Sequence, residues 1–245
     1  MKKMKISLIL LGHANNLFNV NKIKKWKLKI FEITNIQTIE HLPECKVDDD
    51  YLDQKFEKDQ LSNLITCPSE SDLAMGIMAY RFIDNFYMHR IGSNCVVVSL
   101  HGITDLLSRE FISADNFILK QIYEASAIKR LFKIISTDDV YSLVHRDTRG
   151  CLFDLNGDKQ DIIYNTEKPI LCNSCKAEFK TRQIEEDVIS VFESELKKIC
   201  KPKILQIELF IKKYPLFSIL TTGIIAIALN LIASALWDFI KILTK

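Results

Sequence analysis

The sequence predicts an α/β domain in which helices pack on a mixed sheet, followed by a helical neck and one transmembrane helix. Apolar residues make up 48% of the 245 residues and charged residues 26%, a balance typical of globular proteins. Apolar runs predict buried strands in the N-terminal part, helical spacing predicts helices after them, and a late stretch carries no charge. We therefore expect four parts: a domain over residues 1–180, a neck over 181–213, a membrane span over 214–238 and a short tail over 239–245.

Strands dominate the N-terminal part of the predicted domain. The apolar run at residues 6–11 is shorter than the roughly 7–15 residues that a signal peptide needs, so it is interpreted as a first buried strand. The alternation and the β-branched runs that follow predict several more strands and one acidic loop over residues 45–52. These further strands are expected over residues 26–39, 72–82, 85–90 and 94–100.

Helices dominate the rest of the soluble part. After a short helix over 103–109, a long helix is expected from near Ser113, a residue type that caps helix N-termini well. Residues 183–200 carry apolar side chains on one side of a helix, which Pro202 then breaks. Residues 204–213 are expected to continue as a helix toward the span.

The predicted span runs from Pro215 to Trp237, 23 residues without a charge. A helix of this length reaches about 35 Å and can cross a hydrocarbon core of about 30 Å. Only eight residues follow Trp237, so the helix is expected to insert as a tail anchor in the inner (cell) membrane. Six lysines between residues 197 and 213 precede the span and two follow it, which predicts a single-pass protein with a cytoplasmic N-terminal domain.

A stripe of small and polar residues follows one side of the span. A mid-membrane Asn is unfavourable unless another helix or water satisfies its amide, so the stripe predicts a homo-oligomer in the lipid bilayer. Two interpretations stay open, namely a dry helix dimer and a ring of helices whose stripe lines a pore. The stripe recurs every four residues at Ser218, Thr222, Ala226, Asn230, Ser234 and Asp238.

A cluster of lysines surrounds a tryptophan near the N-terminus. Such a patch can hold phosphate groups of a small anionic ligand, or it can be the solvated side of an edge strand that lysines protect against aggregation. The net charge of +2 gives no further indication of nucleic acid as a partner. The cluster consists of Lys22, Lys24, Lys25, Trp26, Lys27 and Lys29.

The cysteines predict a metal site in a reducing compartment. Seven cysteines are an odd number with uneven spacing, unlike the paired cysteines of small secreted domains. Cys172 and Cys175 form a C-x-x-C pair, and His145 with Cys151 supplies two further donors upstream. Four such protein ligands suit a structural Zn²⁺ and leave no open position for water. Reduced cysteines in a core are the alternative.

These ligands belong to a longer pattern that resembles the end of the archaemetzincin-type metalloprotease motif. That family has H-E-x-x-H-x-x-G-x-x-H, then C-x4-C-x-M, and a C-x-x-C pair after a spacer. His145 corresponds to the last histidine, Cys151 to the second cysteine, and Cys172 with Cys175 to the closing pair. The resemblance covers about 60 residues and implies a metzincin-like α/β fold with a zinc site.

The sequence departs from this motif in its catalytic half. Arg146 stands where the first structural cysteine belongs, and Phe153 replaces the methionine. Counted without gaps, residues 135, 136 and 139 occupy the His, Glu and His positions. With a loop insertion, residues 123–127 match better but keep only Glu124. Because a hydrolytic zinc needs three protein ligands and a water, we expect a pseudo-enzyme without catalytic residues, in which Glu124 is a surface or paired buried carboxylate.

The functional hypothesis at this stage is a membrane effector. Its spans would form an oligomeric pore or ion channel, regulated by the cytosolic pseudo-protease domain through a regulatory protein or small anionic ligand, plausibly in bacterial anti-phage defence. One alternative is a tail-anchored zinc-dependent hydrolase, with His13, His89 or His101 supplying missing ligands. Another is an anchored adaptor that binds a partner protein.

Overall fold

The computed structural model describes residues 2–26, 28–44, 46–47 and 54–243. Lys27 and most of the predicted acidic loop lie outside these residues. The chain divides into two compact units, Met1–Cys200 and Lys201–Lys245. The first unit therefore continues beyond residue 180 and includes the first helix of the predicted neck.

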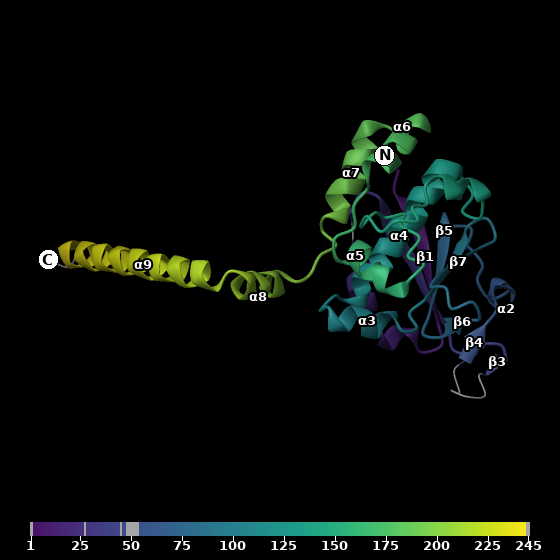
Figure 1. Ribbon diagram of the computed structural model, residues 1–245, viewed down its shortest axis with the longest axis horizontal. Coiled ribbons are helices and arrows are strands. Elements are labelled where there is room, and N and C mark those ends of the chain that lie inside the picture. Colours follow the sequence, from purple (N-terminus) through teal and green to yellow (C-terminus); the bar gives the residue numbers. More distant parts are fainter. Residues whose placement is uncertain (1, 27, 45, 48–53, 244–245) are drawn as a thin grey trace. The chain divides into compact units, whose positions relative to one another are not determined.

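A five-stranded sheet forms the centre of the first unit, which confirms the predicted α/β class (Figure 1). Four strands are parallel, and the edge strand β7 runs antiparallel to its neighbour β8. Every residue of β5 and of β8 is buried, as expected for parallel strands covered on both faces. In sheet order the strands are β2 (Phe31–Ile39), β1 (Met4–Leu11), β5 (Leu73–Met78), β8 (Cys95–Ser99) and β7 (Met88–Ile91).

Alternate residues of the sheet face two different cores. Val96 and Val98 of β8 belong to the large core that the helices share, whereas Cys95 and Val97 belong to a smaller core on the other face. The smaller core is closed by a second sheet and by α2 (Lys58–Ser62). That sheet consists of β3 (Lys46–Val47), β4 (Gln54–Phe56) and β6 (Arg81–Phe82).

The long helix α4 (Ala114–Phe132) is the main element of the large core. Ser113 caps it by accepting a hydrogen bond from the backbone N–H of Asp115, as the sequence predicts. Residues 115–128 form an unbroken buried run, so the helix is enclosed on all sides. The other helical segments are η1 (Ala14–Asn16), α1 (Val20–Lys24), α3 (Ile103–Arg109), η2 (Asp138–Ser142), η3 (Lys159–Asp161), α5 (Ile162–Glu167), α6 (Asn173–Thr181) and α7 (Glu186–Leu196).

Two predicted strands differ from the structure. The extended segment expected over residues 26–39 begins only at Phe31, because the lysine-rich stretch before it forms α1 with Asn19 as its N-cap. The strand expected over 72–82 is divided into β5 and β6 by a turn after Met78. In both cases local turn and capping chemistry interrupts an apolar pattern that looks continuous in the sequence.

A buried carboxylate joins α7 to α4 and β2. Glu195 of α7 accepts hydrogen bonds from the backbone N–H groups of Lys29 and Ile30 and from the Tyr123 hydroxyl, at 2.8 Å for the last. Tyr123 in turn accepts from the indole N–H of Trp26 at 2.9 Å. Burial, with the charge of Glu195, raises the pKa of Tyr123, so its hydroxyl stays protonated and donates.

We expect Glu195→Ala to destabilise the first unit by about 3 kcal/mol, because two backbone N–H groups and one hydroxyl lose their acceptor in the core. Glu193→Ala on the same helix is the matched control. Glu193 pairs with Lys176 near the surface, so its loss is expected to cost about 0.5 kcal/mol. Urea unfolding followed by Trp26 fluorescence measures both, and equal losses would contradict a structural role for Glu195.

The second unit consists of α8 (Lys203–Lys213) and α9 (Pro215–Leu243). α9 is long and apolar enough over Pro215–Ser234 to cross a membrane, and none of that segment is buried. The hydroxyls of Ser218 and Thr222 bond to the backbone oxygens of Tyr214 and Ser218, respectively. The predicted stripe lies wholly within α9, although the structure describes only the backbone of Asp238.

Candidate metal centre

The loop between η2 and α5 supplies the first two ligands of the candidate centre. The backbone N–H of His145 donates to the oxygen of Phe153, so the loop folds back on itself. Gly150 turns the chain with a φ of +73°, a conformation that favours glycine, and Cys151 follows at once. One carboxylate oxygen of Asp154 accepts from the backbone N–H groups of Arg149 and Cys151, at 2.8 and 2.9 Å. This turn places the Cys151 sulfur in the core.

The N-terminus of α6 supplies the other two ligands. Cys172 is the N-cap residue, and Cys175 lies in the first turn. Unpaired backbone N–H groups at a helix N-terminus favour negative charge, so thiolates are stabilised there. Ser174 contacts the Cys172 sulfur through its hydroxyl at 3.0 Å, and Arg149 donates to the same hydroxyl at 3.2 Å.

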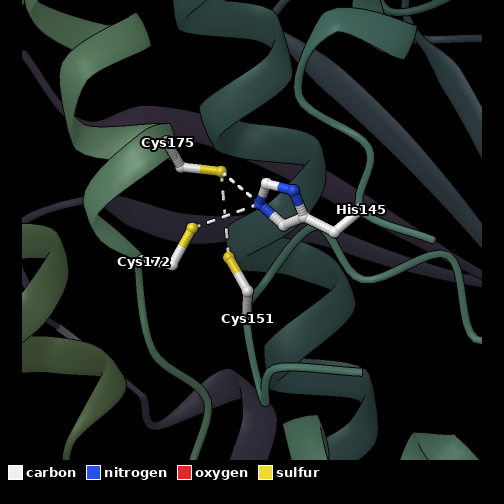
Figure 2. A group of neighbouring side chains, drawn as sticks. All are labelled: His145, Cys151, Cys172 and Cys175. Atoms are coloured by element: carbon white, nitrogen blue, oxygen red, sulfur yellow. Dashed lines mark hydrogen bonds between the residues drawn. The ribbon is translucent and has the colours of Figure 1, made fainter. Parts of the chain in front are cut away.

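The four donor atoms lie close enough together to share one zinc ion (Figure 2). All lie within 4.8 Å of one another. The Cys151 and Cys175 sulfurs are 3.8 Å apart, equal to the edge of about 3.8 Å expected between two sulfurs bound to zinc at about 2.3 Å. His145 Nε2 lies 3.0 Å from the Cys175 sulfur and 3.2 Å from that of Cys172. The cluster can therefore hold zinc with four protein ligands.

The protons of the cluster are unequally distributed. The hydrogen bond between the two sulfurs lowers the pKa of Cys151 to about 6 and, together with burial, raises the pKa of Cys175. At Cys172 burial opposes ionisation, but hydrogen bonds from the Ser174 hydroxyl and the Cys175 backbone outweigh it and lower the pKa. Zinc must displace the remaining protons, so its binding depends on pH.

The structure thus brings together all four residues that the sequence predicts as zinc ligands. The other histidines lie apart from them. His13 precedes η1, His89 pairs with Asp84 at 3.0 Å, and the backbone oxygen of His101 accepts from Lys159. Among the described residues, His145 and the three cysteines are the one group of three or more metal-binding side chains.

The predicted lysine cluster has structural partners. Lys22 pairs with the buried carboxylate of Asp115 at 3.0 Å, and Trp26 packs against the large core while it donates to Tyr123. The indole is therefore engaged on the protein side. Lys24 and Lys25 belong to α1 and its C-cap, Lys29 donates its backbone N–H to Glu195, and Lys27 lies outside the described residues. Anion binding at this cluster stays a prediction.

A cavity of about 370 Å³ lies beside the metal centre and was not predicted from the sequence. β7 with the residues before it, the segment around η2 and residues 153–155 supply its walls. Glu124 of α4 also lines it and pairs at 2.8 Å with the fully buried Lys120, which confirms the predicted paired carboxylate. Burial favours the neutral amine, but the charge of Glu124 raises the pKa of Lys120.

The only sequence signals for this cavity are the strand pattern around residue 88 and Glu124 on the long helix. The walls come from five separate segments of the chain, from Lys58 to Leu155. Because contacts between such segments depend on the packing of α4 against the sheet, no single motif contains them.

No protein-family model matches this sequence, and no curated protein matches it. Solved structures do. An archaemetzincin from Methanopyrus kandleri matches with a TM-score of 0.46 and 11% identity, over 74% of this chain and 96% of that one. An archaemetzincin from Archaeoglobus fulgidus, in complex with malonate, matches with a TM-score of 0.41 and 13% identity, over 71% and 99%. A zinc-dependent peptidase from Methanocorpusculum labreanum has a TM-score of 0.38 and 12% identity, over 71% and 98%.

These comparisons correct one expectation from the sequence. From the sequence alone, the chain is predicted to lack enzymatic activity. The similar solved structures, however, are archaemetzincins and a zinc-dependent peptidase. The prediction of a non-enzyme is therefore contradicted. The likeness to archaemetzincins and the zinc cofactor agree with the sequence analysis.

We expect one zinc ion per chain and a fall in zinc affinity as the pH is lowered through about 6, where protons compete for Cys151. Cys172→Ser should weaken zinc binding roughly a hundredfold or more, since about 10–16 kcal/mol of binding is shared by four ligands. Cys200→Ser, outside the cluster, is the control. Chelator competition across pH measures the zinc affinity of the unsubstituted chain and of both variants. An affinity that does not depend on pH would contradict thiolate ligation.

Proposed function

We propose that this protein is a membrane-anchored, zinc-stabilised domain that binds an extended polypeptide segment along the edge of β7. The observation that carries this proposal is the position of the cavity, which opens beside a sheet edge that no other described strand covers. A strand added to such an edge gains backbone hydrogen bonds, while neighbouring pockets select its side chains.

The hydrogen-bond pattern of β7 supports strand addition. Ser99 N–H donates to the Tyr87 oxygen at 2.9 Å, so residues 87, 89 and 91 bond inward to β8. In an antiparallel ladder the alternate residues Met88 and Arg90 then direct their backbone groups toward the outer edge. These groups are suitable partners for an incoming strand.

The lining of the cavity is mixed and suits a ligand with both apolar and polar side chains. Hydrophobic residues, among them Phe86, Tyr141 and Phe153, make up half of its walls, and polar or charged residues make up the other half. The charged lining residues carry both signs. Lys58 and Arg90 are positive, whereas Glu124, Asp138 and Asp154 are acidic. Polar groups that converge beside hydrophobic side chains in a pocket are typical of a ligand site.

Membrane anchoring is the second part of the proposal. α9 has the length and composition of a span, and its apolar side chains are exposed. The excess of lysines before α9 favours a cytoplasmic first unit, in line with the free cysteines of that unit. Such an anchor would hold the peptide-binding edge near a membrane.

Random decapeptides displayed on phage test the proposed binding. We expect enrichment of sequences with both apolar and polar side chains, whose affinity falls when alternate backbone amides of the peptide are N-methylated. Arg90→Pro should weaken binding about fivefold to tenfold, because it removes an outward N–H while leaving the bonds to β8 intact. Isothermal titration with one enriched peptide measures the effect.

The matched control is Arg90→Ala, which removes the same side chain and keeps the backbone donor. If Arg90→Pro and Arg90→Ala bind the peptide with the same affinity, the backbone N–H of residue 90 contributes nothing, and strand addition is wrong. Any loss relative to the unsubstituted chain then comes from the side chain alone. Mass spectrometry of the same mixtures shows whether peptides are cleaved. Cleavage that is lost in Glu124→Gln would assign hydrolysis to this cavity.

A second candidate function, a pore formed by several copies of α9, is favoured by Asn230. The hydroxyls of Ser218 and Thr222 are satisfied within the helix, whereas no hydrogen bond of the Asn230 side chain occurs among the described residues. Partner helices or water in a pore would supply the partners that lipid lacks.

We expect the full chain, reconstituted in liposomes, to release a trapped ion indicator, and Asn230→Leu to abolish the release. Leu229→Ala, one position away on a different side of the helix, is the control that should keep it. Absence of flux in the unsubstituted chain, with and without an enriched peptide, would exclude the pore and leave the anchor intact.

A further inference from the structure

An apolar face on α8 is largely uncovered by the described residues of the second unit, apart from the contacts of Phe210 with Tyr214 and Phe217. Ile204, Ile207, Phe210 and Ile211 fall within about one third of the helix circumference, because successive residues are rotated by about 100°. Their exposed fractions are 75, 55, 47 and 48%. No residue of α8 is buried. A helix this short is marginally stable alone in water, so its apolar face needs a cover.

The rest of the circumference of α8 is mixed: it carries Glu208, Lys212, Lys213 and Gln206 together with Leu205 and Leu209. Glu208 and Lys212 form an ion pair at 2.7 Å, one helical turn apart. Lys213 and Gln206 lie farther round the helix, and the amide of Gln206 donates to the backbone oxygen of Lys201. With Lys203 at its start, α8 has three lysines and one glutamate.

α8 is joined directly to α9 through an aromatic cluster. Only Tyr214 separates the two helices, and its backbone N–H donates to the Phe210 oxygen at 2.9 Å while its own oxygen accepts from Ser218 at 3.0 Å. The ring of Phe210 lies 5.3 Å from that of Tyr214 and 6.1 Å from that of Phe217. The apolar face of α8 therefore continues into the surface of the candidate span.

We propose that α8 lies in the headgroup region of the membrane that α9 crosses, with its isoleucine face toward the acyl chains and Lys212 and Lys213 toward anionic lipid phosphates. Amphipathic helices with lysines on the polar face bind membranes in this way. Lysine side chains keep their charged ends in the headgroup layer while their stems cover apolar surface. This inference rests on the proposed anchoring by α9.

Quenching by brominated lipids tests the inference in the full chain. Ile207→Trp places a reporter at the centre of the apolar face, and Leu209→Trp places the same reporter on the opposite side of the helix. The unsubstituted chain, with Trp26 and Trp237, supplies the background. In phosphatidylcholine vesicles with about 30% phosphatidylglycerol, we expect quenching at residue 207 to exceed that at 209 about twofold or more.

A comparison of two vesicle compositions tests the role of the anionic lipid. Quenching at residue 207 should fall in vesicles of phosphatidylcholine alone, and Lys212→Gln with Lys213→Gln should remove this difference between the two vesicles. No dependence on the anionic lipid would overturn the role assigned to the lysines.

The remaining outcomes distinguish a failure of the inference about α8 from a failure of membrane anchoring by α9. Equal quenching at 207 and 209 means that α8 is inserted on all sides, which overturns it. No quenching at 207 in protein that resists alkaline carbonate extraction means that a protein surface, such as a second copy, covers α8, and this also overturns it. Protein that carbonate extracts is not anchored by α9, and the proposed function fails first.

Discussion

Burial of α4 is the constraint on which the first unit depends. Residues 115–128 are buried without interruption, so its polar side chains as well as its apolar ones face protein. A buried polar group is unfavourable unless it is hydrogen-bonded, and in α4 the side chains of Gln121 and Ser126 have no such partner among the described residues. Tyr123 donates a hydrogen bond to Glu195 and accepts one from Trp26, and Lys120 donates to Glu124. The first set of bonds brings α7, β2 and α1 around the helix, and the second sets a charged pair beside the cavity.

The metal centre and the cavity share one short segment of chain. Asp154 accepts two backbone hydrogen bonds from the turn that carries Cys151, and it also lines the cavity with Phe153. Zinc bound to Cys151 would therefore hold one wall of the cavity in place, although the ion itself has four protein ligands. Under the proposed function, the metal would stabilise the site, and the edge of β7 together with Glu124 would form the surface that meets a ligand.

The zinc ligands could be predicted because their chemistry is carried by local motifs. A C-x-x-C pair at a helix start with an upstream His and Cys has few other uses, and the structure brings the four donors within 4.8 Å. The lysine cluster shows the opposite case. Its charges are obvious in the sequence, yet Asp115, which pairs with Lys22, lies more than ninety residues away. Tyr123, which engages Trp26, is as distant.

The sequence by itself determined the α/β class, the long helix from Ser113, the zinc ligands and an apolar C-terminal helix, because periodicity, capping and ligand spacing are local properties. Only the tertiary structure decided that Glu124 pairs with Lys120 beside a cavity and that β7 lies at one edge of the five-stranded sheet. Strand order and the partners of buried charges arise from contacts between distant segments. Such contacts depend on how the core packs, which no local pattern encodes.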